Sequence, residues 1–265
     1  MDMLSNFDLR EEIKDYWGKR AATFDTQAGH EIFSENERVA WQKLLRRHLG
    51  AGEGRTALDL ACGTGVLSHL MVDLGFQVTG MDWAGPMLER ARTKAESRQR
   101  AIRFVLGDAE RTMEPADHYD ALVCRHLVWT LVDPPAAFRE WHRVLKPGGR
   151  LLIVDGDFVN AGFVSRLAAG LAAFLEKRMP ANPASGPKSG PADMREIHRS
   201  ILARVYFSKG ARADAVARLL QEAGFSDIRV DTNLRAIHRA QSRDFSFLKG
   251  LERAAQHRYA ISAAK

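Results

Sequence analysis

Residues 57–68 read ALDLACGTGVLS. Residues 57–60, which are apolar except for Asp59, predict the end of a buried strand, and Val66–Leu74 predict a helix. Between them, Gly63 and Gly65 permit a sharp turn and let the backbone approach a ligand where a side chain would clash. The helix N-terminus has free N–H groups and a partial positive charge, which suit a carboxylate or a phosphate. The stretch therefore predicts a strand, a glycine turn and a helix that together bind a nucleotide.

The spacing of the glycines separates two kinds of cofactor. Dinucleotide-binding folds prefer Gly-x-Gly-x-x-Gly after the first strand, whereas the third glycine position here is Ser68. Asp59 lies within the strand end, just before the turn. This pattern resembles the first motif of class I S-adenosylmethionine-dependent methyltransferases, which is close to Asp-x-Ala/Gly-Cys/x-Gly-Thr/x-Gly. The resemblance covers roughly Asp59–Asp155, with a weaker match at Tyr16–Asp25.

Composition limits the class of protein. A chain of 265 residues with 45% hydrophobic residues can form one large α/β domain with an elaboration, or two small domains. Its two cysteines, Cys62 and Cys124, argue against a secreted disulfide framework. Residues 1–12 lack the apolar segment of a signal peptide, and no uncharged apolar run reaches the roughly 18 residues of a membrane span. We therefore expect a cytoplasmic protein without a membrane span.

The net charge of +6 bears on the partners of the chain. Nucleic-acid binding is one interpretation of such a charge. However, the basic residues form no dense run with interleaved aromatics, so arginines scattered over solvated helix faces explain the charge better. An acidic small substrate is also consistent with it. We expect a small-molecule acceptor and no nucleic acid; the oligomeric state stays open, with a homodimer among the possibilities.

Strands and helices alternate along the middle of the chain. The expected strands lie at 57–60, 77–81, 102–106, 119–124 and 150–155, and the expected helices between them lie at 66–74, 86–98 and 136–145. This alternation predicts a parallel, doubly wound α/β sheet. Residues 146–149, Lys-Pro-Gly-Gly, are expected to end the last of these helices. The family resemblance implies a Rossmann-like sheet of about seven strands, mostly parallel, with one antiparallel strand near the C-terminus.

The chain is expected to have four parts. These are an N-terminal helical cap at 1–50, a Rossmann-like cofactor-binding core at 51–156, a helical insertion at 157–210 and a C-terminal completion of the core sheet at 211–265. The expected elements after the core are helices at 161–178 and 194–206 around a proline-rich loop at 179–191, a helix at 214–223, a strand at 227–231, a helical segment at 245–255 and a last strand at 258–262. The cap and the insertion are expected to cover the strand ends as a lid, although the helix at 161–178 could equally be a structural layer or a dimer surface.

Polar residues end the expected strands in turn. They are Asp59, Asp82, Asp108, the pair Arg125 and His126, and the pair Asp155 and Asp157. A single acid at such a position is often only a turn or cap residue. Because open α/β sheets bind ligands beyond the carboxyl ends of their strands, the whole series predicts one ligand-binding rim.

The resemblance to the methyltransferase family implies roles at this rim. Asp82 would accept both ribose hydroxyls, because the two oxygens of a carboxylate match a vicinal diol. Asp108 would accept the adenine amino group, and the Ala109 N–H would reach a ring nitrogen. The backbone of residues 61–64 would border the methionine part, whose carboxylate would pair with Arg20. The cofactor-binding residues implied in this way are Tyr16, Arg20, Asp59, Ala61, Cys62, Gly63, Asp82, Trp83, Met87, Asp108, Ala109 and Arg125.

Several of these residues have a second interpretation. Trp83 and Met87 could cover the adenosine or simply belong to the core. Cys62 is better explained by packing and backbone fit than as a nucleophile. The histidines and cysteines show no metal-ligand spacing, so we expect no metal.

Catalysis by this family would need mainly correct placement. The methyl group sits on a cationic sulfur, so a nucleophile held in line about 3 Å away can react directly. Trp17, Phe24 and Trp129 are candidates for cation–π contact with the sulfonium. His126 is the candidate base if the nucleophile carries a proton, unless it turns away and caps the following helix. Asp155 and Asp157 are weaker candidates for the same role.

Other functions compete with methyl transfer. An NAD-dependent oxidoreductase is disfavoured by Ser68, and a module that binds S-adenosylmethionine without turnover stays open. Asp133-Pro134-Pro135-Ala136 resembles the motif of amino-methylating nucleic-acid enzymes, but it lies too far after the strand and lacks the aromatic residue that would stack on a flipped base. We interpret the two prolines as a helix start.

Overall fold

The computed structural model describes residues 3–27, 29–160, 192–242 and 257–265. The predicted helix at 161–178, the loop at 179–191 and the helical segment at 245–255 lie outside these residues. In the described ranges, none of the helices combines the length and the apolar character needed to cross a membrane.

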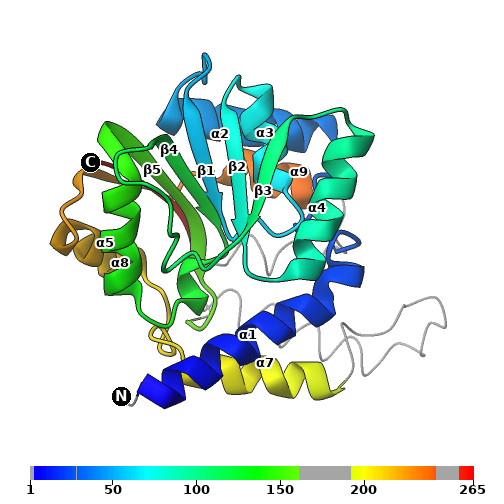
Figure 1. Cartoon of the computed structure of the whole chain (residues 1–265), viewed down its shortest axis with the longest axis vertical. Coiled ribbons are helices and arrows are strands. Elements are labelled where there is room, and N and C mark those ends of the chain that lie inside the picture. Colours follow the sequence, from blue (N-terminus) through cyan, green and yellow to red (C-terminus); the bar gives the residue numbers. More distant parts are fainter. Residues whose placement is uncertain (1–2, 28, 161–191, 243–256) are drawn as a thin grey trace.

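A seven-stranded sheet forms the centre of the molecule (Figure 1). Its strands are β1 (Thr56–Leu60), β2 (Gln77–Asp82), β3 (Ile102–Leu106), β4 (Tyr119–Arg125), β5 (Leu145–Asp157), β6 (Ser226–Asp231) and β7 (His257–Ala264). They lie in the order β3-β2-β1-β4-β5-β7-β6. Strands β1 to β5 pair in parallel, and β7 pairs antiparallel with both β5 and β6. The predicted fold class, including its antiparallel strand near the C-terminus, is confirmed.

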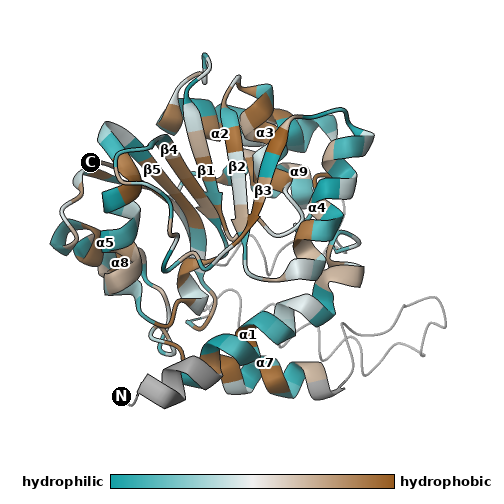
Figure 2. Cartoon of the chain, in the orientation of Figure 1, coloured by the Kyte–Doolittle hydropathy of each residue, from teal (hydrophilic) through white to brown (hydrophobic). Residues whose placement is uncertain are grey.

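Helices cover both faces of this sheet. The described helices are α1 (Met3–Phe24), α2 (Glu35–Leu49), α3 (Val66–Asp73), α4 (Gly85–Ser97), the short 3-10 helix η1 (Val128–Thr130), α5 (Pro134–Val144), α7 (Ala192–Arg204), α8 (Ala213–Glu222) and α9 (Arg235–Gln241). Alternation along each strand sends successive side chains to opposite faces. Ala57 therefore packs with α2, α3 and α9, whereas Leu58 and Leu60 pack with α5 and α8. In Figure 2 the strands are largely hydrophobic, as expected for a sheet covered on both sides.

Helices α1 and α7 lie side by side across one end of the sheet (Figure 1). The Tyr16 ring of α1 stacks on the His198 ring of α7 with 5.4 Å between centroids. An ion pair joins Arg204 of α7 to Glu12 of α1, and Ile13 is fully buried between the helices and the protein body. The two helices thus form one cover over the carboxyl ends of the strands.

The structure corrects three element predictions. Residues 146–149 do not end a helix; α5 ends at Val144 and these residues belong to β5, where the pairing with β4 shifts register. Gly148 has φ +76 there, a conformation that favours glycine and lets the strand turn locally. Helix α9 was not predicted, because its seven residues RAIHRAQ show too short an apolar pattern. The last strand is longer than the predicted 258–262.

The predicted helix start at the two prolines is confirmed. Helix α5 begins at Pro134, and the Asp133 side chain accepts a hydrogen bond from the Ala136 N–H at 3.1 Å. The helix buries Phe138 and Trp141 completely, and the Trp141 Nε1–H donates to the Ala109 carbonyl at 2.7 Å. Trp141 therefore connects the core to the loop after β3.

Trp141→Ala should lower the free energy of unfolding by about 3–5 kcal/mol, because it removes a fully buried indole and its hydrogen bond. Trp141→Phe should cost less, since it keeps most of the apolar volume. Urea unfolding followed by circular dichroism measures both. Equal and small losses in the two variants would contradict the packing described here.

Candidate functional site

One cavity of about 1110 Å³ lies between the strand ends and the α1–α7 cover. Every residue that the sequence singled out for cofactor binding lines it, as does His126: Tyr16, Arg20, Asp59, Ala61, Cys62, Gly63, Asp82, Trp83, Met87, Asp108, Ala109, Arg125 and His126. The structure thus brings these residues together, while their individual roles stay predictions.

The glycine turn has the backbone that its sequence demands. Gly63 and Gly65 have φ +57 and +84, in the left-handed region that favours glycine. The Cys62 N–H donates to the Met81 carbonyl at 2.9 Å, which joins the turn to β2. The Cys62 side chain is buried, and this burial raises the pKa of its thiol well above the usual range. A thiol of this kind is a poor nucleophile near neutral pH, while the backbone of Cys62 still borders the cavity.

Ser68 explains why the third glycine is missing. Its hydroxyl donates to Asp59 Oδ2 at 2.6 Å, and both side chains are buried. Burial raises the pKa of Asp59 to about 7, an effect that the Ser68 hydrogen bond opposes. Ser68 thus satisfies an acid that would otherwise lie unpaired beneath the turn.

Asp82 joins two backbone segments at the edge of the cavity. Its Oδ2 accepts the Gly63 N–H and its Oδ1 accepts the Ala84 N–H, both at 2.8 Å. The residue is 7% exposed, and burial raises the pKa of its carboxyl to about 6 despite these bonds. Each carboxylate oxygen has a second lone pair, so Asp82 can still accept hydroxyl groups from a ligand.

The loop after β3 is held from two sides. Asp108 Oδ1 accepts the Glu110 N–H at 2.8 Å, and Trp141 fixes the Ala109 carbonyl. Glu110, which the sequence analysis did not select, also lines the cavity and pairs with Arg10 of α1. These contacts place Asp108 and Ala109 on the same wall as Asp82.

Arg20 belongs to the cover, and its guanidinium already makes hydrogen bonds within the protein. Its Nη1 donates to the Tyr16 hydroxyl at 2.7 Å and its Nη2 donates to Gln27 Oε1 at 2.9 Å. It also lies over the Trp17 ring at 5.5 Å. Each terminal nitrogen has a second N–H, so these contacts orient Arg20 without exhausting its donors.

Arg125 and His126 follow β4 at the floor of the cavity. Arg125 Nη2 donates to the His30 carbonyl at 2.8 Å, and the guanidinium lies 5.4 Å from the Trp41 ring centroid. Burial lowers the pKa of Arg125. His126 has φ +57, and its ring lies 5.5 Å from that of Phe158.

The helix that follows is capped by Asp155, not by His126. Asp155 Oδ2 accepts the Val128 N–H at 2.7 Å, and Oδ1 accepts the Gly156 N–H at 2.8 Å. Asp157 accepts the backbone N–H groups of Val159 and Asn160. Neither aspartate lines the cavity, so both are wrong as candidate bases. Burial raises the pKa of Asp155 to about 7 without giving it access to a ligand.

Aromatic side chains form one wall of the cavity. Trp17 lies 6.1 Å from Phe24 and 6.4 Å from Trp129 between ring centroids, so the predicted aromatic residues gather. Phe158 and His198 complete the wall, at 6.0 Å and 5.6 Å from Trp129. Neither residue could be predicted from the sequence, because neither belongs to a motif and only tertiary contacts bring them to the cavity.

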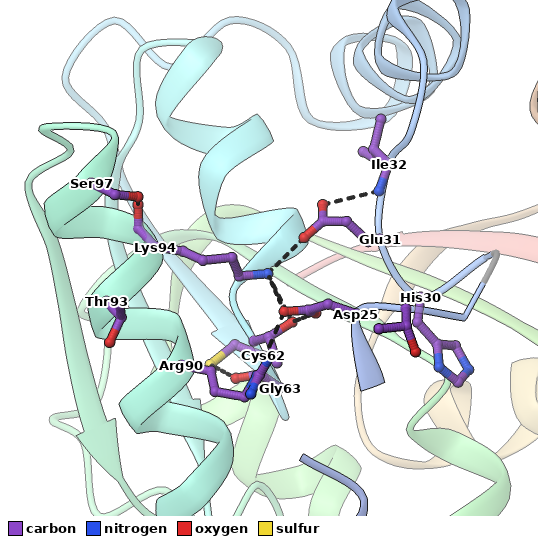
Figure 3. Close-up of polar contacts among 12 residues, drawn as sticks. Asp25, His30, Glu31, Ile32, Cys62, Gly63, Arg90, Thr93, Lys94 and Ser97 are labelled. Carbon is purple, nitrogen blue, oxygen red and sulfur yellow. Dashed lines mark hydrogen bonds and ion pairs between the residues drawn. The ribbon is translucent and has the colours of Figure 1, made fainter. Parts of the chain in front are cut away.

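Lys94 ties the N-terminal segment to the glycine turn. Its Nζ lies 2.7 Å from Glu31 Oε2, 3.2 Å from Asp25 Oδ2 and 3.0 Å from the Thr64 hydroxyl. The Thr64 hydroxyl in turn donates to Asp25 Oδ1 at 2.6 Å. Figure 3 shows Lys94 reaching from α4 between Glu31 and Asp25, above Gly63. This cluster, which sequence reasoning missed, fixes the chain just after α1 and so positions the cover.

Comparisons with known proteins agree with this site. A family model described as a methyltransferase domain matches residues 58–153. The demethylmenaquinone methyltransferase of Paenarthrobacter aurescens (strain TC1) is 28% identical over 243 residues, which cover 89% of this chain and 85% of that protein. The ubiquinone/menaquinone biosynthesis C-methyltransferase UbiE of Bdellovibrio bacteriovorus is 31% identical over 153 residues, covering 57% of this chain and 64% of that protein.

A solved structure shares the fold. Phosphoethanolamine N-methyltransferase 2 of Haemonchus contortus, in complex with S-adenosyl-L-methionine, matches 94% of this chain with a TM-score of 0.64 and 16% identity. This chain covers 57% of that protein's length.

The sheet order with its antiparallel β7, and the glycine turn after β1, define the class I methyltransferase fold. The chain belongs to the class I S-adenosylmethionine-dependent methyltransferases. It is an enzyme whose methyl donor is S-adenosylmethionine, which decides against the NAD-dependent oxidoreductase and against a module without turnover.

Lys94→Met should weaken binding of S-adenosylhomocysteine about threefold to tenfold, because it frees the segment after α1 from the glycine turn. Calorimetric titration measures the dissociation constant. Lys14→Met is the matched control, since Lys14 pairs with Glu11 of the same helix, with both side chains exposed. A lower melting temperature with unchanged affinity would mean that Lys94 stabilises the fold alone.

Donor binding should weaken as the pH falls through about 6, because protonation of Asp82, whose pKa burial raises to about 6, removes an acceptor from the cavity. Asp82→Asn should bind S-adenosylhomocysteine about tenfold more weakly near pH 8 and show a flatter pH dependence. The same titration between about pH 5 and 8 tests both effects. If the variant keeps the affinity and the pH dependence of the wild type, Asp82 does not bind the ribose.

Proposed function

We propose that this enzyme methylates a ring carbon of a small aromatic acceptor of the quinone type, in its reduced, hydroxylated form. The observation that carries the proposal is the cavity under the cover, where the residues expected to bind the methyl donor lie along the strand ends and aromatic side chains line another part. Its volume of about 1110 Å³ exceeds the roughly 300–1,000 Å³ typical of a site for one small ligand, which leaves room for a donor and an acceptor. The names of the quinone-modifying relatives support the acceptor class.

The strand-end half of the cavity fits S-adenosylmethionine. Asp82 would accept the ribose hydroxyls with its free lone pairs, and Asp108 with Ala109 would bind adenine. A Cβ on Gly63 would lie 3.7 Å from the Phe24 ring, so glycine keeps this approach open to the methionine part. Arg20, held by Tyr16 and Gln27, would pair with the donor carboxylate. When bound, S-adenosylmethionine supplies an electrophilic methyl group on a cationic sulfur.

The aromatic half suits a flat acceptor. Trp129, Trp17 and Phe158 offer ring faces and edges for stacking, which orients a ring by shape rather than by charge. His126 faces the same space and would accept the proton of an acceptor hydroxyl. Loss of that proton places electron density on the adjacent ring carbon, which would attack the methyl group while the methyl–sulfur bond breaks and S-adenosylhomocysteine leaves. The ring carbon would then lose its own proton to water, the hydroxyl oxygen would take back the proton from His126, and aromaticity would return.

The cover would exclude water from this reaction. We propose that the helical cap at 1–50 and the insertion at 157–210 act together as a lid on the core at 51–156, with 211–265 completing the sheet. Support comes from α1 and α7, which supply Tyr16, Trp17, Arg20 and His198 to the cavity from both parts. A closed cavity strengthens every polar interaction within it, because water no longer competes.

With S-adenosylmethionine and 1,4-dihydroxynaphthalene under anaerobic conditions, the enzyme should form a product methylated on a ring carbon. Mass spectrometry and proton NMR of the product distinguish carbon from oxygen methylation. His126→Asn should lower kcat by about a hundredfold or more while the affinity for S-adenosylhomocysteine stays the same. An oxygen-methylated product would contradict the carbon acceptor, and full activity of the variant would remove His126 from the mechanism.

A further inference from the structure

The cover carries cations on its cavity side. Lys19 and Arg20 of α1, Arg195 and Arg199 of α7, and Arg258 of β7 line the cavity. The lining carboxylates among the described residues come instead from the strand ends and the loop after β3: Asp59, Asp82, Asp108 and Glu110. Apart from Arg125 in β4 and Arg258 in β7, the charges that line the cavity are therefore separated, with acids beside the proposed adenosine site and cations on the cover.

The packing of α1 against α7 brings the cations of the two helices next to each other. Tyr16 stacks on His198, whereas Glu12, one turn earlier in α1, pairs with Arg204, which comes later in α7. The helices are thus antiparallel, and the turn after Tyr16 lies beside the turn before His198. Burial and the nearby Arg20 lower the pKa of His198, which agrees with this alignment. Lys19 and Arg20 consequently face the turn of α7 that carries Arg195.

Some cations of the cover form ion pairs and others do not. Farther along the two helices, Arg10 pairs with Glu110, Lys14 with Glu11, and Arg204 with Glu12. Where the end of α1 lies beside the start of α7, Lys19, Arg195 and Arg199 make no ion pair within the described part of the chain.

The unpaired cations repel one another. Arg195 and Arg199 are also four residues apart on one helix face, an arrangement in which like charges destabilise the helix. The repulsion is relieved if an anion binds between the helices.

We propose that Lys19, Arg195 and Arg199 bind an acidic group of the acceptor, a carboxylate or a phosphate, which lies on the acceptor at a distance from the methylated position. The inference rests on the proposed function, since it takes the acceptor to occupy the aromatic half of this cavity. Arg20 is assigned to the donor carboxylate, and Arg258 belongs to β7, where it lies over the Phe158 ring. Lys19, Arg195 and Arg199 are therefore the cations of the cover that are left for a second anion. Guanidinium groups match the paired oxygens of carboxylates and phosphates, which makes this ligand chemistry the natural one.

The test measures binding without turnover. Wild-type enzyme saturated with S-adenosylhomocysteine is titrated with 2-naphthoate, 2-naphthyl phosphate and the neutral 2-naphthylmethanol, and quenching of tryptophan fluorescence reports binding beside Trp17 and Trp129. At least one of the anions should bind about tenfold more tightly than the alcohol, and raising the salt from about 0.05 M to about 0.5 M should reduce that difference. The comparison of the two anions identifies the preferred acid.

The double variant Arg195→Gln/Arg199→Gln should lose the preference for the anion and keep the affinity for the alcohol. Arg212→Gln/Arg229→Gln removes the same charge from exposed positions outside the cavity and should keep the preference. Lys19→Gln repeats the test from α1 if the α7 variant does not fold.

An alcohol that binds as tightly as both anions would overturn the inference. A preference that survives in the double variant, or that disappears equally in the control, would also overturn it. An anion preference that follows Arg195 and Arg199, combined with no methylation of dihydroxynaphthalenes, would refute the quinone-type acceptor and leave the anion site standing.

Discussion

The bond between the Gly63 N–H and Asp82 joins the two loops on which the cavity depends. Strands β1 and β2 are neighbours, so the turn after one and the acid after the other meet at the same edge of the sheet. The same carboxylate holds the Ala84 N–H at the start of the next helix. One buried group thereby fixes the shape of the glycine turn, the beginning of α4 and the place where a ligand hydroxyl can bind. Lys94, further along α4, extends this arrangement to the segment that follows α1.

Buried carboxylates recur at this end of the sheet and serve different purposes. Asp59 is satisfied by Ser68, Asp155 by backbone N–H groups, and Asp82 keeps lone pairs directed to the cavity. Burial raises the pKa of all three, to about 7, 7 and 6 respectively. The residue type and its place at a strand end are therefore insufficient to assign a role. Asp82 differs from Asp155 because it lines the cavity, and it differs from Asp59 because its hydrogen bonds hold the glycine turn and the segment before α4.

This difference explains how far the sequence could predict the site. The turn at 57–68 and the acids at the ends of β2 and β3 follow from local sequence and from the rule that parallel strands end together, so their gathering around one cavity could be predicted. Asp155 and Asp157 satisfied the same rule but bind backbone groups, which depends on the path of the chain after β5. His198, Arg195 and Arg199 belong to no motif and reach the cavity only because α7 packs against α1, while Phe158 reaches it through the path of the chain just after β5. The role of Lys94 could likewise not be predicted, since its partners Asp25 and Glu31 come from a distant part of the sequence.

The way in which the α1–α7 cover is attached bears on how the methyl donor enters the cavity and how the spent donor leaves it. The cover is fastened near one end by Lys94 and near the other by Arg10 with Glu110, and its helices are joined by Arg204 with Glu12. These fastenings are charge pairs with partly solvated members, each modest in strength, whereas the sheet beneath is held by continuous hydrogen bonding and apolar packing. The cover also packs on the body through apolar side chains, since Ile13 lies with Val132 and Ala21 lies with Ala84 and Met87. Opening the cavity to exchange spent donor for fresh donor therefore costs these few ion pairs and two small apolar clusters, and leaves the packing of the sheet unchanged.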